Sequence, residues 1–266
     1  MTCELATRIA VGALASAAIA WLARRRGSLS RSGAWAALGI GTVIYAAGGF
    51  AWFSALGAFF FTSTLLGRVG RARKQATKRE FEKGDTRDAW QALSNGGVAA
   101  AAALGMILLP SPLWTAAFVG ALATANADTW ATELGVLSRR DPISLVRFAR
   151  VPRGTSGAVS PLGLAATLGG AATIGVVFAL FARAPSALWV ATCAGTLGSL
   201  ADSLFGATLQ ARFYCPTCDR ENIEGPRHHC GTATEHRGGL RAFNNDAVNL
   251  AATLAGALLA VLLYPR

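Results

Sequence analysis

Long apolar stretches constrain the fold of this sequence more than any other feature. A helix of about 20 apolar residues crosses the hydrocarbon core of a bilayer. The stretches cover residues 4–22, 33–67, 95–109, 113–136, 160–182, 187–209 and 247–263. The second is too long for one helix, and Gly48-Gly49 near its middle predicts two tight spans. Because 53% of the residues are hydrophobic and 15% charged, we expect a single all-α membrane domain over residues 1–266, with about eight transmembrane spans (roughly six to eight).

Basic residues are concentrated in four connections between these stretches. The connections hold 22 of the 25 lysines and arginines, and they cover residues 23–31, 68–90, 138–154 and 211–243. An eight-span layout places all four on one side, which the positive-inside rule makes cytoplasmic. We therefore expect a protein of the bacterial inner membrane with both termini outside. The basic residues behind the net charge of +11 would then orient the protein in the membrane and contact membrane lipids. The sequence shows no basic face with interleaved aromatic residues, so we do not expect nucleic-acid binding.

Four carboxylates lie inside or at the edge of the apolar stretches. They are Asp128, Glu133, Asp202 and Asp246. A carboxylate in hydrocarbon needs a counter-charge, a metal ion or a water-filled cavity. These four could merely neutralise arginines or cap helices, but the predicted topology brings all of them to the cytoplasmic ends of their helices. Nearby side-chain amides are Asn95, Asn126, Asn245 and Asn249. Since carboxylate and amide oxygens suit Mg²⁺ held together with substrate phosphates, we favour a magnesium and phosphate site.

Two connections on the same predicted side add groups suited to phosphate. The segment 151–160 is rich in glycine and hydroxyl side chains and leads into a helix, whose N-terminus attracts anions. Such turns are common before helices, so this signal is weak by itself. Lys83 and Arg87 lie in the other connection. A charged loop beside a membrane is usually only solvated, but two cations near several carboxylates are what a metal–nucleotide complex needs.

The last basic connection contains a cluster of cysteines and histidines. A Cys-x-x-Cys pair is followed by His228, His229 and Cys230. Soft ligands at this spacing predict zinc, and disulfides are disfavoured in the cytoplasm. We favour a closed, structural zinc site with four ligands, Cys215, Cys218, His228 and Cys230. His229 could replace His228. The zinc ion would supply folding energy that this polar cytoplasmic loop lacks.

The polar segments together resemble a known membrane protein family. The segments are NADTWATELG at 126–135, GTSGAVS at 154–160, DSLFGATLQ at 202–210 and NDAVN at 245–249. They are similar, in order, to motifs of the family that includes plant phytyl-phosphate kinase. The resemblance covers most of the chain, from about Lys83 to the C-terminus, while the N-terminal third matches only in hydrophobicity. A similar Cys-x-x-Cys and His-x-Cys insertion in bacterial relatives favours His228 as the fourth ligand.

The resemblance implies phosphoryl transfer from a nucleoside triphosphate, such as CTP, to an isoprenyl monophosphate. It also implies distant kinship with phytol and dolichol kinases and CDP-diacylglycerol synthases. By motif it implies a magnesium centre at Asp128, Asp202 and Asp246. The other candidate catalytic residues are Asn126, Glu133, Asn245 and Asn249. The candidate nucleotide- and phosphate-binding residues are Lys83, Arg87, Asn95, Arg153, Gly154, Thr155, Ser156 and Gly157.

Two other functions deserve comparison with this kinase. A CTP-dependent lipid nucleotidyltransferase would use the same groups but would release pyrophosphate. A transporter for a small solute tends to place polar groups near the membrane midplane, between related halves of the chain. This sequence has no convincing internal repeat, and its acids lie toward one end of the helices. An enzyme at the membrane interface is therefore favoured.

Overall fold

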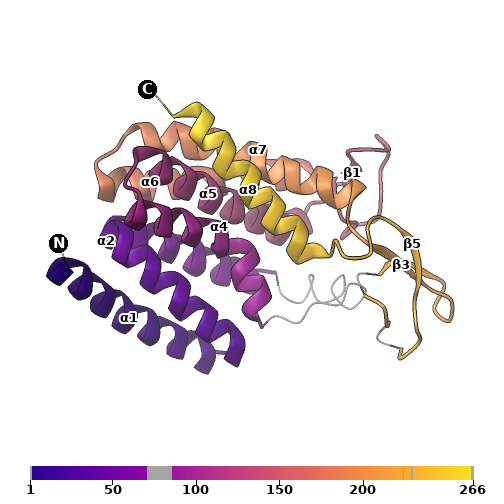
Figure 1. Ribbon diagram of the computed structural model, residues 1–266. Coiled ribbons are helices and arrows are strands. Elements are labelled where there is room, and N and C mark those ends of the chain that lie inside the picture. The colour runs from indigo at the N-terminus through magenta and orange to yellow at the C-terminus, as the bar shows by residue number, and fades with distance from the viewer. Residues whose placement is uncertain (1, 71–85, 224, 229, 265–266) are drawn as a thin grey trace.

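The computed structural model describes residues 2–70, 86–223, 225–228 and 230–264. Within these ranges the chain forms a bundle of long helices, with small β-strands at one end (Figure 1). The helices are α1 (Thr2–Arg25), α2 (Arg31–Arg68), α4 (Ala89–Leu108), α5 (Pro112–Gly135), α6 (Pro161–Ala182), α7 (Ser186–Thr208) and α8 (Asn245–Leu263). Six of these described helices are long and apolar enough to cross a membrane, which lies within the predicted range. The start of α1 and the end of α8 lie at the opposite end from the strands (Figure 1).

α2 consists of two helices that run in opposite directions and meet at Gly49. This residue has φ 59° and ψ −145°, a conformation that is largely restricted to glycine. A Cβ atom built on Gly41 would lie 3.3 Å from the Phe53 ring. In one straight helix these two residues would be roughly 18 Å apart along the axis. The chain therefore reverses at the predicted glycine pair, and all the predicted helical segments are present among the described residues.

α5 lies at the centre of the bundle (Figure 1). Every residue from 116 to 127 is buried. Small residues allow the neighbouring helices to approach it closely. A Cβ atom on Gly120 would lie 2.3 Å from the Gly256 carbonyl oxygen of α8, and one on Gly195 of α7 would lie 2.8 Å from the Ala123 Cβ. This close packing brings the polar ends of α5, α7 and α8 together.

Side-chain caps fix where the helices near the site begin. Asp88 accepts a hydrogen bond from the Gln91 backbone N–H at 2.9 Å, so α4 begins at Ala89. The predicted start at 95 was therefore six residues too late, because the cap lies within a charged segment. Asn95 lies inside α4, where its amide donates to the Gln91 carbonyl oxygen at 2.9 Å. The start of α8 is likewise capped by Asn244, whose side chain accepts from the Ala247 N–H.

Two basic connections contain short antiparallel strands that the sequence did not predict. In the connection between α5 and α6, β1 (Ile143–Ser144) pairs with β2 (Ala158–Val159). In the connection between α7 and α8, the strands follow the order β4-β3-β5. Their bounds are β3 (Arg212–Cys215), β4 (Arg220–Ile223) and β5 (Glu235–Gly238). The cysteine-containing connection is thus a small folded lobe, which we call the cysteine lobe (211–243).

Candidate functional site

A cavity of about 700 Å³ opens at the end of the bundle that carries the basic connections. Its volume lies within the range of sites for small molecules and cofactors. Most of the candidate residues line it, although they come from widely separated parts of the sequence. These lining residues are Arg87, Asn95, Asp128, Glu133, Arg153, Gly154, Thr155, Ser156, Gly157, Asp202, Asn245, Asp246 and Asn249. Lys83 lies outside the described residues.

Carboxyl groups from two helices meet in this cavity. The side chains of Asp128 on α5 and Asp202 on α7 are joined by a hydrogen bond. Two carboxyl groups in contact need a shared proton or a cation between them. The Oδ2 atom of Asp202 is buried and has no hydrogen-bond partner among the described residues. A buried carboxylate oxygen without a donor suits a metal ligand, so this pair fits a divalent cation.

The first turns of α8 complete the acidic part of the cavity. Asp246 lies in the first turn of this helix, and Asn245 and Asn249 lie one turn apart. All three line the same cavity as Asp128 and Asp202. Carboxylate and amide side chains from three helices therefore line one space, and oxygens of these types suit a cation that is shared with bound phosphates.

Four arginines line the cavity, Arg26, Arg68, Arg87 and Arg153, of which the sequence predicted the last two as candidate phosphate-binding residues. The backbone of Arg87 is held in place, since its N–H donates to the Ser28 carbonyl and its carbonyl accepts from the Ser30 N–H. Burial lowers the pKa of Arg87 and the charge of Glu133 opposes that shift, but an arginine side chain stays protonated. Arg153 lies 3.4 Å from an Asp141 carboxylate oxygen. Fixed positive charge therefore borders the acidic centre.

The glycine-rich segment forms a tight loop against α7. Gly154 and Gly157 have φ values of 87° and 72°, which favour glycine. A Cβ atom on Gly157 would lie 2.4 Å from the Ser203 carbonyl oxygen, one residue after Asp202. The Ser156 hydroxyl donates a hydrogen bond to the Gln210 side-chain oxygen at 2.5 Å. The loop is therefore fixed to the helix that carries Asp202, and we call residues 154–157 the glycine loop.

Gln210 does not line the cavity but contacts the glycine loop, and the sequence did not predict this contact. It is 3% exposed, and it lies between the end of α7 and the cysteine lobe. The residues on either side of Gln210 also form backbone hydrogen bonds. The Ala211 N–H donates to the Phe243 carbonyl, and the Leu209 carbonyl accepts from the Leu240 N–H. The two ends of the cysteine lobe are thereby joined next to Gln210, which accepts the hydrogen bond from the glycine loop. The DSLFGATLQ segment contains Gln210, but nothing in it indicates a partner 54 positions away.

The structure does not bring Asn126 to the cavity, contrary to the sequence-based assignment. Asn126 is fully buried. Its amide nitrogen donates to the Gly170 carbonyl at 2.7 Å, and its side-chain oxygen accepts from the Thr62 hydroxyl at 3.1 Å. Residues two positions apart in a helix point to nearly opposite sides, so Asn126 cannot share the direction of Asp128. It joins α5 to α6 and α2 instead.

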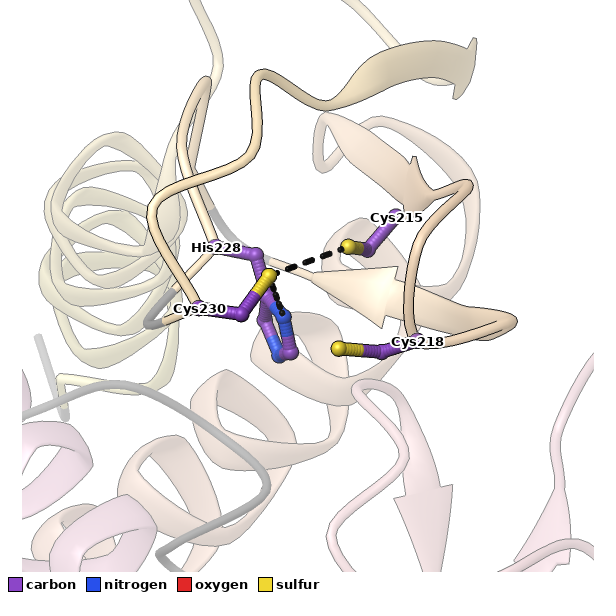
Figure 2. Close-up of side chains that lie close together, drawn as sticks. All are labelled: Cys215, Cys218, His228 and Cys230. Carbon is purple, nitrogen blue, oxygen red and sulfur yellow. Dashed lines mark hydrogen bonds between the residues drawn. The ribbon is translucent and has the colours of Figure 1, made fainter.

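The cysteine lobe brings together the four predicted metal ligands. Figure 2 shows the side chains of Cys215, Cys218, His228 and Cys230 pointing toward one another. Their ligand atoms all lie within 4.8 Å of one another. The Cys215 and Cys230 sulfurs are 3.6 Å apart, and the His228 Nδ1 is 3.2 Å from the Cys230 sulfur. Ligands around a tetrahedral zinc ion are roughly 3.8 Å apart, so this cluster could hold a metal ion. His229 lies outside the described residues.

The environment of Cys230 favours its thiolate form. Hydrogen bonds with the Thr232 side chain and backbone, and with His228, lower the pKa of Cys230 to about 5. Cys218 differs, because its hydrogen bond with Cys230 and its burial raise its pKa to about 11. A metal ion binds thiolates and displaces their protons. The cluster thus contains one thiolate that is already favoured and a second sulfur that would need the metal to lose its proton.

The sequence is similar to several membrane proteins. The profile of the integral membrane protein family DUF92 matches residues 14–257. Protein PGR of Arabidopsis thaliana is 31% identical over 93% of each chain. An uncharacterized membrane protein of Methanocaldococcus jannaschii is 28% identical over 99% of this chain and 97% of its own. Protein VTE6, chloroplastic, of A. thaliana is 27% identical over 88% of this chain and 65% of its own. No solved structure matches. The family resemblance predicted from the motifs is confirmed, and the chain belongs to the DUF92 family of integral membrane proteins.

Proposed function

We propose that this protein is a membrane-embedded isoprenyl phosphate kinase. It transfers the terminal phosphoryl group of a nucleoside triphosphate, such as CTP, to an isoprenyl monophosphate. The observation that carries this proposal is that acids of α5, α7 and α8, the glycine loop and four arginines all line one cavity. The similarity to the family that includes plant phytyl-phosphate kinase supports the choice of acceptor.

The proposed reaction exchanges one P–O bond for another. The bond between the terminal phosphorus and the bridging oxygen of the nucleotide breaks, and the nucleoside diphosphate leaves. A new bond joins that phosphorus to a terminal oxygen of the acceptor phosphate. Because the acceptor is already anionic, no side chain has to remove a proton. Catalysis then consists of positioning two anions and neutralising their charge.

The residues of the cavity suit this task. Asp128, Asp202 and Asp246 would hold Mg²⁺, which would neutralise phosphate charge when bound. Arg87 and Arg153 would offset the remaining repulsion between nucleotide and acceptor. The glycine loop would present backbone N–H groups to a phosphate, since its glycines allow close approach. Asn245 and Asn249 would orient the bound phosphates, and Glu133 would hold Arg87 at the cavity.

A nucleotide substrate also sets the orientation in the membrane. Nucleoside triphosphates are cytoplasmic, so the end of the bundle that carries the cavity would face the cytoplasm. That orientation agrees with the positive-inside rule. In a bacterium it places the protein in the inner membrane, with α1 starting and α8 ending on the outer side.

The cysteine lobe would hold a structural zinc ion. Its four ligands complete a tetrahedral shell, which leaves no open position for a substrate. The lobe connects the helix of Asp202 to the helix of Asp246. Zinc would therefore keep the cytoplasmic ends of α7 and α8 at a fixed separation, and so hold the two acids in one site.

The proposal is tested with purified protein in detergent and Mg²⁺. Nucleotide labelled at the terminal phosphate is supplied with a panel of isoprenyl monophosphates, and lipid diphosphate and nucleoside diphosphate are measured. Equal amounts of both products are expected, at a rate at least about a hundredfold above that of Asp202→Ala. Glu4→Ala, which removes an exposed carboxylate at the far end of the bundle, should keep the wild-type rate. Release of pyrophosphate would indicate a nucleotidyltransferase, and solute flux in liposomes without label transfer would indicate a transporter.

A further inference from the structure

The cavity extends beyond the acidic centre into a second, apolar part. This part lies between α1 and the two halves of α2, and we call it the tail lobe. Its lining is formed by apolar side chains that include Ile19, Ala20, Ile40, Phe53, Leu56 and Phe60. Aromatic and aliphatic side chains of this kind bind hydrocarbon.

The tail lobe and the acidic centre are two ends of the same cavity. The second half of α2 lines the cavity from Phe53 to Gly67, a distance of roughly 21 Å along the helix axis. At the far end, a Cβ atom on Gly67 would lie 3.9 Å from a Glu133 carboxylate oxygen. A ligand that fills the whole cavity therefore needs an anionic head at one end and a long apolar chain at the other.

Two buried hydroxyls support a bound ligand in this region. Ser16 on α1 and Ser63 on α2 both line the cavity, and they are 4% and 1% exposed. Neither hydroxyl has a hydrogen-bond partner among the described residues. A tightly packed apolar core rarely contains such groups. Their presence indicates that this part of the cavity binds a ligand, or water that enters with the ligand, and does not serve only the packing of the helices.

We infer that the tail lobe binds the isoprenoid chain of the acceptor, with its phosphate at the acidic centre; this inference rests on the proposed function. The lobe then selects the acceptor by chain length, while the acidic centre acts only on the phosphate. The hairpin of α2, formed at Gly49, is the element that creates the wall of the lobe.

Gly57 allows a direct test, since it lines the lobe and has room for a side chain. A Cβ atom there would meet only the Phe61 ring, at 3.9 Å, which is an ordinary contact. Gly57→Leu therefore places new atoms in the lobe without a backbone clash. Gly39→Leu is the matched control. Gly39 is exposed in the first half of α2, and a Cβ atom there would have no neighbour within 4 Å.

The expected result is a change in chain-length preference. Gly57→Leu should raise KM for a twenty-carbon isoprenyl monophosphate at least about tenfold, and leave KM for a five-carbon one within about twofold. Gly39→Leu should leave both values unchanged. Equal KM values for Gly57→Leu and wild type with the long acceptor would overturn the inference.

A second readout does not depend on turnover. An isoprenyl monophosphate with a photoreactive group near the end of its chain is crosslinked to the purified protein, and the labelled peptides are mapped. Labelling of α1 and α2 that unlabelled isoprenyl monophosphate removes is expected. Labelling of other helices, or competition only by a two-chain phospholipid, would contradict the inference. Crosslinking in the lobe without phosphoryl transfer would refute the kinase reaction and still support the lobe.

Discussion

Gly157→Ala should disable the site through a displacement of the glycine loop. Gly157 has a positive φ of 72°, and an added Cβ atom would lie 2.4 Å from both the Ala207 nitrogen and the Ser203 carbonyl oxygen. Contacts become ordinary at 3.4 Å, so the loop must move away from α7 by about 1 Å. A displacement of about 1 Å in a positioning group costs about 10²-fold in rate. We therefore expect kcat/KM for the nucleotide to fall about a hundredfold.

The control separates this displacement from the cost of the backbone conformation. Alanine at a positive φ that favours glycine costs about 1–3 kcal/mol. Gly49→Ala carries a cost of this kind, since Gly49 has φ 59° and ψ −145°, but its Cβ atom would have no neighbour within 4 Å and Gly49 does not line the cavity. Both variants should lose thermal stability in detergent, and with a five-carbon acceptor, which does not reach the tail lobe, only Gly157→Ala should lose kcat/KM for the nucleotide. Wild-type kcat/KM in Gly157→Ala, or equal loss in both variants, would refute the reasoning.

Four further results are expected. Asp202→Ala should lower turnover by at least about a hundredfold without changing Tm, and a wild-type rate would make this acid structural. Elemental analysis should find about one zinc ion per chain, and Cys218→Ser should lose it; a zinc-free, fully active preparation would refute the assignment. Because the folded-state pKa of Cys230 is lowered to about 5, its thiolate is present above that pH and is lost as the pH falls through about 5. Protons compete with zinc for all three thiolates, so zinc content should fall as the pH is lowered, and zinc content independent of pH would contradict thiolate ligation. Gln210→Ala, which removes the acceptor of the glycine-loop hydroxyl, should lower kcat/KM about tenfold with zinc content unchanged; an unchanged kcat/KM would remove its positioning role.

Much of the fold could be predicted, because apolar length and glycine pairs act locally. The Gly48-Gly49 pair predicts the reversal of α2, since only glycine readily adopts the conformation found at Gly49. The start of α4 was missed because Asp88, which caps that helix, belongs to a strongly charged segment. The strands of the cysteine lobe are short, and their pairing depends on contacts that periodicity does not show.

The candidate site could be predicted where it depends on helix ends. Asp128, Asp202 and Asp246 meet because each lies near the same end of a packed helix. Asn126 was misplaced because nearness in sequence was taken as nearness in space, although positions two apart in a helix point in different directions. Gln210 and the tail lobe could not be predicted, since both depend on how distant elements pack against each other.

The central claim is that α5, α7 and α8 share one cation between their acidic side chains. Fe²⁺ can replace Mg²⁺ in such sites, and with peroxide and ascorbate it cleaves the backbone close to where it is bound. Our account predicts cleavage near positions 128, 202 and 246 together, suppressed by excess Mg²⁺ and absent in Asp202→Ala. Cleavage at only one of these segments, or cleavage unchanged by the substitution, would contradict it.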